Sequence, residues 1–173
     1  TIFDATGKKV VEKKINSCSL KPRETKDFTA DLEVQNAILW SLENPYLYKM
    51  VTSVYEEDKL VDTFQTTFGI RTIRFDANEG FFLNGKHVKI KGTNNHQDHA
   101  GLGAAMPDAL QDFRIKTLRS FGSNAYRCSH NPPTPELLEA CDRLGMLVID
   151  ENRLMGSTHI QLDDVKKMIE RDR

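Results

Sequence analysis

Apolar and polar residues alternate with a period of two through much of the first 75 residues, which is typical of strands that bury one face. The alternation is clearest over Lys49–Glu56 and resumes at Phe64, after the polar turn Glu56–Lys59, so it predicts a hairpin. Weaker alternation over Lys8–Ile15 and Arg23–Leu32 predicts shorter strands. Together these segments favour a half-exposed antiparallel β-sandwich.

Helical spacing replaces this alternation in the second half of the chain. Asp108 is predicted to cap a helix that ends at Gly122, and Thr134 to cap one that ends at Gly145. A third, amphipathic helix is predicted to begin at Asp163. The residues expected on the apolar face of the first helix are Leu110, Phe113, Thr117, Leu118 and Phe121.

Short apolar runs between these helices end in polar, chemically capable residues. Ala125–Tyr126 and Met146–Ile149 are predicted to be buried parallel strands, and a similar run leads into the loop that carries His96. In a parallel βα array the carboxyl ends of the strands meet at one edge. We therefore expect four residues to converge there: His96, Arg127, His130 and Glu151.

Composition narrows the class of partner. With 39% hydrophobic residues in 173, the chain can bury a core, and a net charge of -1 disfavours a nucleic-acid or membrane surface as partner. No run approaches the length of a membrane span, although a leader could precede Thr1. Cys18, Cys128 and Cys141 lack paired spacing and are expected to be core or half-buried thiols.

Alternative interpretations stay open for these candidate residues. His96 and His99 have an H-x-x-H spacing, but a loop fixes no geometry and zinc needs three or four ligands. His96 could instead hydrogen-bond a polar substrate or be a surface histidine. Arg127 could position a carboxylate or form a structural ion pair. Asp150 and Glu151 are neighbours that point to opposite faces, so at most one of them faces the site.

Several longer motifs occur together over roughly residues 39 to 157. They are Leu39–Tyr48, Phe68–Arg71, Phe82–Lys86, the His96 loop, Arg127–His130 and Leu144–Glu151. This set resembles glycoside hydrolase family 2, the group of β-galactosidases and β-glucuronidases. The segments Cys128–Pro133 and Asn152–Gly156 are most similar to bacterial β-galactosidases.

The resemblance implies a fold in two parts. Residues 1–75 are expected to form a partial immunoglobulin-like β-sandwich, and residues 76–173 the first three βα units of a (β/α)8 TIM barrel. A barrel that stops after its third strand has unpaired backbone groups at its edge. We therefore expect self-association through this open edge, or burial of Met146–Ile149 beneath the C-terminal helix.

The resemblance also implies roles for the residues expected at the carboxyl ends of the parallel strands, an edge that we call the rim. The family's histidines at the positions of His96 and His130 contact sugar hydroxyls, and its arginine at the position of Arg127 supports the catalytic nucleophile. Glu151 and Asn152 are expected beside that arginine. The acid/base and nucleophile glutamates of the family lie on later strands. We therefore expect no catalytic residue in this chain and no activity from it alone.

Two further expectations follow from the same resemblance. Leu154–Ser157 stands where some β-galactosidases carry a Glu-x-His pair that helps to hold magnesium, so no metal and no cofactor is expected. The strand end at Ser129–His130 is expected to contain a non-proline cis peptide bond.

The implied function is that of a fragment of a retaining exo-glycosidase that hydrolyses terminal β-galactosides in carbohydrate metabolism, with a β-linked sugar as its partner. A β-glucuronidase fragment is one alternative. A non-catalytic carbohydrate-binding or scaffold module is another, but such a module has no nucleophile for Arg127 to position. Trp40, expected in the sandwich, would offer no stacking platform at the rim. The compartment stays open between bacterial cytoplasm and periplasm.

Overall fold

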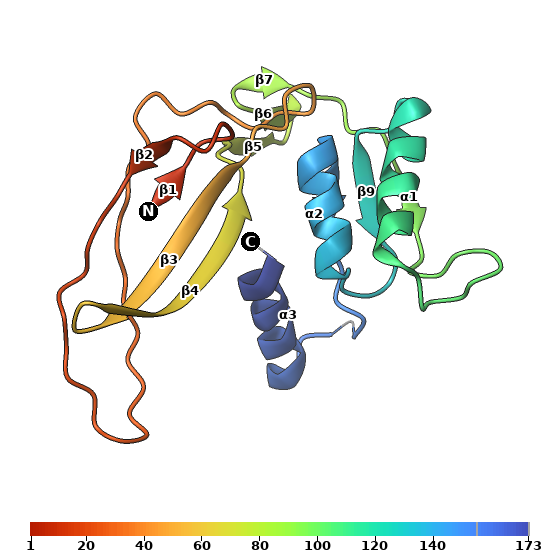
Figure 1. Ribbon diagram of the computed structural model, residues 1–173. Helices are drawn as coiled ribbons and strands as arrows, with labels where there is room; N and C mark the ends of the chain where they lie inside the picture. The colour runs from red at the N-terminus through yellow and green to blue at the C-terminus, as the bar shows by residue number, and fades with distance from the viewer. Residues whose placement is uncertain (155, 173) are drawn as a thin grey trace. The chain divides into compact units, whose positions relative to one another are not determined.

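A computed structural model describes residues 1–154 and 156–172, which form two compact units (Figure 1). The first unit comprises Thr1–Ile38 and Tyr46–Ile70, and the second comprises Leu39–Pro45 and Arg71–Arg173. The elements are β1 (Ile2–Phe3), β2 (Lys9–Val11), β3 (Tyr48–Glu56), β4 (Lys59–Phe68), β5 (Ile73–Asp76), β6 (Gly80–Leu83), β7 (Lys86–His87), β8 (Gly92–Asn95), α1 (Asp108–Ser120), β9 (Ala125–Cys128), α2 (Pro135–Leu144), β10 (Leu147–Ile149) and α3 (His159–Asp172).

The first unit contains a four-stranded antiparallel sheet in the order β2-β1-β3-β4. Its long hairpin, β3 and β4, confirms the predicted pair of strands. The turn between them includes Glu57 in the left-handed region, with φ 53°. Tyr48 at the start of β3 is buried, and its ring stacks on that of Phe68 at 5.9 Å between centroids. The contact between Tyr48 and Phe68 thus anchors one end of the hairpin.

Two expectations for this unit are wrong. Arg23–Leu32 contains no strand, because nearly all its side chains are exposed and it has no apolar face to pack on a sheet. Phe28, its largest apolar residue, is also exposed. Cys18 is an exposed free thiol rather than a core residue, whereas Cys128 and Cys141 are buried as expected.

The second unit contains a small antiparallel sheet, β5-β6-β7, and a parallel sheet in the order β10-β9-β8. Gly92, Ala125 and Leu147 lie in register at the start of the parallel strands. A Cβ on Gly92 would lie 2.5 Å from the carbonyl oxygen of Ala125, so only glycine permits this close approach. Both predicted parallel strands are thereby confirmed.

Helix α2 begins and ends as its sequence predicts. Thr134 has an extended conformation, and its side chain accepts a hydrogen bond from the backbone N–H of Leu137. Gly145 ends the helix in the left-handed conformation, with φ 72°. Leu137 and Cys141 face a buried cluster that also includes Tyr126 of β9.

Helix α1 differs from the prediction at its cap and on its buried face. Pro107 occupies the N-cap position, so Asp108 is the first helical residue and makes no capping bond. Gln111 and Ile115 are the buried residues, while Phe113 and Phe121 are exposed. The helix turns this face inward because Ile115 packs into the cluster shared with α2 and β9.

Trp40 is also placed differently from the prediction, because it belongs to the second unit rather than to the sandwich. It is 1% exposed, and its Nε1–H donates to the backbone carbonyl of Asp142 in α2 at 2.8 Å. Asn84 donates to the carbonyl of Trp40, and the guanidinium of Arg71 lies 5.0 Å from its ring centroid. These contacts hold the segment Leu39–Pro45 in the second unit.

Helix α3 begins at His159, four residues before the predicted start at Asp163. Thr158 and Gln161 exchange hydrogen bonds between side chain and backbone in the manner of a capping box, which explains the earlier start. None of the described residues of α3 is buried. Met146 and Leu147 are buried, Met146 in the cluster with α2 and β9, whereas Ile149 of β10 is 47% exposed. The strand is therefore not buried beneath the C-terminal helix as expected. Of the residues described, no helix is long and apolar enough to cross a membrane.

Candidate sugar-binding rim

The four residues predicted to converge do lie together. His96 follows β8, Arg127 lies in β9 with His130 just beyond it, and Glu151 follows β10. The three strands are parallel, so their carboxyl ends share one edge. The rings of His96 and His130 face each other edge to face, with centroids 6.0 Å apart.

Glu151 is the centre of this group. One of its carboxylate oxygens pairs with the guanidinium of Arg127, and the other lies 2.7 Å from Nδ1 of His130. The Glu151 side chain is 18% exposed, whereas that of His130 is 63% exposed. A half-buried carboxylate therefore orients one cation and one imidazole that remain accessible to a ligand.

This contact also fixes what His130 can offer. Because Nδ1 of His130 faces a carboxylate, it carries a proton, and Nε2 is left for another partner. Nε2 accepts a hydrogen bond when the ring is neutral and donates one when the ring is protonated. Either form suits a sugar hydroxyl, which both donates and accepts.

Asn94 is a rim residue that the sequence analysis missed. Its Oδ1 accepts a hydrogen bond from Nη1 of Arg127 at 3.0 Å. The parallel register pairs Asn94 directly with Arg127 across β8 and β9. Aligning the two predicted strands by their ends would have indicated this partner.

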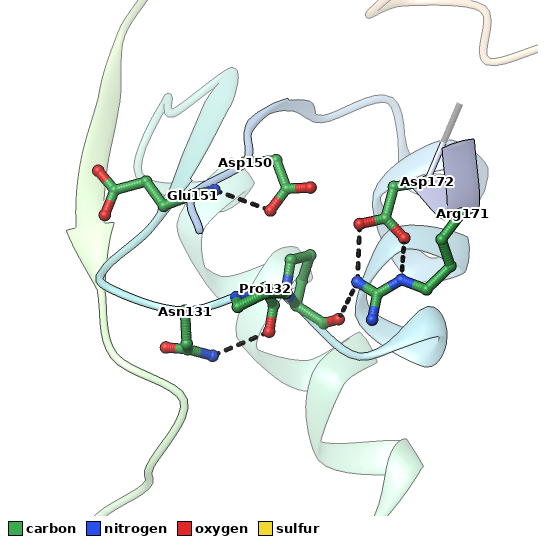
Figure 2. Close-up of polar contacts among 7 residues, drawn as sticks. Asn131, Pro132, Asp150, Glu151, Arg171 and Asp172 are labelled. Atoms are coloured by element: carbon green, nitrogen blue, oxygen red, sulfur yellow. Dashed lines mark hydrogen bonds and ion pairs between the residues drawn. The ribbon is translucent and has the colours of Figure 1, made fainter. Parts of the chain in front are cut away.

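Asp150 and Glu151, which follow β10, point in different directions, as Figure 2 shows. Asp150 accepts a hydrogen bond from the backbone N–H of Glu151 and turns towards Asp172 of α3. Burial, together with the hydrogen bond and charge of Asp172, raises the pKa of Asp150 to about 6. Only Glu151 of the two joins the rim.

Helix α3 meets the strand ends through its last turn (Figure 2). Arg171 donates two hydrogen bonds to Asp172, at 2.5 and 2.7 Å, and one to the backbone carbonyl of Pro133 at 3.0 Å. Burial opposes ionisation of Asp172, but its hydrogen bonds with Arg171 and Asp150 hold the pKa of its carboxyl below the usual range. Asp172 is therefore the ionised member of the Asp150–Asp172 pair.

Three further expectations concern the Ser129–His130 peptide bond, Asn152 and His99. The peptide bond between Ser129 and His130 is cis, as expected. The Nδ2 atom of Asn152 is buried and has no hydrogen-bond partner among the described residues. His99 lies in a turn closed against Gly103, and the described residues contain no group of three metal-ligating side chains. Met155, within the segment Leu154–Ser157 on which the expectation of no metal rests, lies outside the described residues.

A cavity of about 160 Å³ in the second unit borders these side chains. Its lining includes Asn95, Gln97 and Asn131, the sequence neighbours of His96 and His130, together with Arg114 and Tyr126, but none of the four rim residues. Tyr126 is buried among the helices, whereas its strand neighbour Arg127 joins the rim.

Family models match nearly the whole chain. The model described as Glycosyl hydrolases family 2, TIM barrel domain, matches residues 75–171. The model described as Glycosyl hydrolases family 2 matches residues 1–71.

Relatives with two different names are similar to the chain. The beta-galactosidase BoGH2A of Bacteroides ovatus is 42% identical over 151 residues, a match that covers 87% of the chain and 18% of that protein. A beta-glucuronidase of Bacteroides fragilis is 30% identical over 151 residues, covering 87% of the chain and 22% of that protein. The chain thus spans less than a quarter of the length of either relative.

Two solved structures are also similar to the chain. A crystal structure of Bacteroides uniformis beta-glucuronidase superposes with a TM-score of 0.84 at 31% identity, covering 99% of the chain and 21% of that structure. A family 2 member from Bacteroides cellulosilyticus is 50% identical, with a TM-score of 0.67, over 69% of the chain and 16% of that structure.

Proposed function

Because the chain belongs to glycosyl hydrolases family 2, we propose that it supplies the sugar-binding rim of a retaining exo-glycosidase acting on terminal β-galactosides. Its parallel strands would be the first three of a (β/α)8 barrel, and residues 1–75 and 76–173 would be the sandwich and barrel domains. The observation that carries this proposal is the carboxylate of Glu151, which holds Arg127 and His130 at one strand edge.

Each rim residue has a role that its contacts support. His96 and His130 hydrogen-bond hydroxyls of the terminal sugar, since both are exposed and their rings face each other. Arg127 is anchored by Glu151 and Asn94 on one side, and its remaining N–H groups can orient the carboxylate of a nucleophile. Asn152 completes the support beside Glu151 with its unpaired amide N–H.

The hydrolytic step itself requires two carboxyl groups outside this set. In a retaining glycosidase one acid protonates the glycosidic oxygen, while a second carboxylate about 5 Å away attacks the anomeric carbon. Water then cleaves the glycosyl–enzyme ester and restores both groups. At this rim Glu151 is tied to a cation and Asp150 turns away, so we propose that the chain binds sugar but does not hydrolyse it alone.

A β-glucuronidase is the second candidate, because both names occur among the relatives and the Bacteroides uniformis structure superposes at a TM-score of 0.84. That activity would need further basic or amide groups for the uronic carboxylate. A non-catalytic carbohydrate-binding module is the third. The anchored guanidinium of Arg127 argues against it, because a binding module has no nucleophile to orient.

Hydrolysis of aryl β-galactosides and aryl β-glucuronides distinguishes these candidates. The whole protein that the gene encodes and the 173-residue chain would be assayed in parallel with both substrates. We expect the whole protein to prefer the galactoside and the chain to be inactive. Preference for the glucuronide would select the second candidate, and sugar binding without hydrolysis by the whole protein would select the third. Turnover by the purified chain would refute its dependence on other carboxylates.

A further inference from the structure

Arg114, in the middle of α1, contacts both ends of the loop that carries His96. Its Nη2 donates to the backbone carbonyl of His96 at 2.7 Å, and its Nη1 donates to Sδ of Met106 at 3.6 Å. Its guanidinium carbon lies 5.9 Å from the ring centroid of Tyr126, which is buried in β9. A single side chain therefore connects the loop, the helix and the core beneath the sheet.

The loop between these two contacts closes on itself. The backbone N–H of His99 donates to Gly103 at 3.0 Å, and the N–H of Gly103 donates back to His99 at 2.9 Å. Gly101 and Gly103 have the positive φ values, 80° and 69°, that such a tight turn requires. Because the turn is held by its own backbone, its placement over the helix depends on the residues at its base, where Arg114 binds.

We propose that Arg114 is a positioning residue for sugar recognition, which fixes the backbone of His96 and thereby the place of its imidazole opposite His130. This inference rests on the proposed role of His96 at the rim. The planar guanidinium has several donors in a fixed fork, so it can hold both ends of the loop at once. A lysine ammonium is a single point that cannot span both contacts.

A double-mutant cycle in the whole protein tests this coupling. kcat and KM would be measured for the parent, Arg114→Met, His96→Ala and the double variant, with the aryl glycoside that the parent hydrolyses best. We expect Arg114→Met to lower kcat/KM by about tenfold, within the loss of up to about 100-fold that misplacing a group by 1 Å can cause. In the His96→Ala background the same substitution should cost almost nothing more, because its effect passes through His96.

Arg119→Met is the matched control on the same helix. Arg119 also binds backbone carbonyls, those of Leu42 and Gly145, but neither belongs to the loop. Its removal should lower the melting temperature and leave kcat/KM unchanged. A purely structural role for Arg114 would make the two arginine variants behave alike.

The outcomes separate this inference from the proposed function. Losses that multiply in the double variant would overturn the positioning role and leave the role of His96 intact. Parental activity in His96→Ala would overturn both. If Arg114→Met does not fold, Arg114→Lys keeps the charge near Tyr126, and amides of residues 96–106 should exchange faster than in the parent while α1 is unchanged. Unchanged exchange in that variant would also overturn the positioning role.

Discussion

Glu151 joins Arg127 and His130 through one half-buried carboxylate. Glu151→Gln keeps the size of the side chain but removes the charge that both partners face. Breaking such a pair leaves a cation unpaired and costs about 1 to 3 kcal/mol, which corresponds to roughly 5- to 150-fold in kcat/KM. We expect a loss in this range for the whole protein. The exposed Glu139 of α2 gives the control, Glu139→Gln, and an equal loss in both variants would contradict the role of Glu151.

The three cysteines differ sharply in their environment. Burial raises the pKa of both Cys128 and Cys141, that of Cys128 to about 12, whereas Cys18 is exposed. Since the thiolate is the reactive form, iodoacetamide at about pH 8 should label Cys18 alone in the folded chain and all three thiols in denaturant. Mass spectrometry of the labelled peptides measures this. Early labelling of Cys141 in the folded chain would contradict the buried cluster.

At the scale of elements, the contact between Asp172 of α3 and Asp150, the residue that follows β10, should depend on pH. The pKa of Asp150 is raised to about 6 by burial and by Asp172, against about 4 in an unfolded chain. The folded chain therefore binds the proton of Asp150 more tightly than the unfolded chain does. The stability that protonated Asp150 contributes is complete below about pH 4 and is lost as pH rises through about 6.

Asp150→Asn mimics the protonated carboxyl and provides the measurement. We expect this variant to melt at a higher temperature than the parent at pH 8 and to lose that advantage at pH 4. Asp98→Asn, at an exposed position of the loop that carries His96, should change little at either pH. A difference between Asp150→Asn and the parent that is the same at both pH values would disprove the linkage.

The ends of α1 and α2 offer a comparison of two glycines. Gly122 and Gly145 have similar positive φ values, 87° and 72°, so alanine at either position is strained by about 1 kcal/mol or more. A Cβ at Gly145 would also lie 2.5 Å from the carbonyl oxygen of Leu42, whereas nothing lies within 4 Å at Gly122. We expect Gly145→Ala to reduce the free energy of unfolding by clearly more than Gly122→Ala. Equal losses in denaturant titrations would show that Leu42 does not pack there.

At the scale of the whole molecule, the unpaired edge of β10 is the feature that should cause self-association. In the described sheet β10 pairs with β9 alone, and its Ile149 is exposed. Unpaired strand edges with exposed apolar residues promote association. We expect the 173-residue chain to self-associate with increasing concentration in sedimentation velocity, and Ile149→Lys to weaken this association. Phe113→Lys, at an exposed position of α1, is the control. A monomer at every concentration would contradict this prediction.

The sequence by itself determined the features that depend on near neighbours. The β3–β4 hairpin, the caps of α2 at Thr134 and Gly145, and the convergence of polar residues at strand ends were all predicted. Side-chain periodicity and capping chemistry act over a few residues, so these features can be predicted from the sequence alone. The cis bond before His130 is different, because it was inferred from a family resemblance rather than from local chemistry.

Only the tertiary structure decided the features that join residues distant in sequence. It turned Ile115 rather than Phe113 inward, packed Trp40 on α2, and paired Arg127 with Asn94. It also placed Arg114 beneath the His96 loop. Each outcome depends on register and on which faces pack together. These are set by the combined packing of several elements, so a local pattern of apolar and polar residues does not contain them.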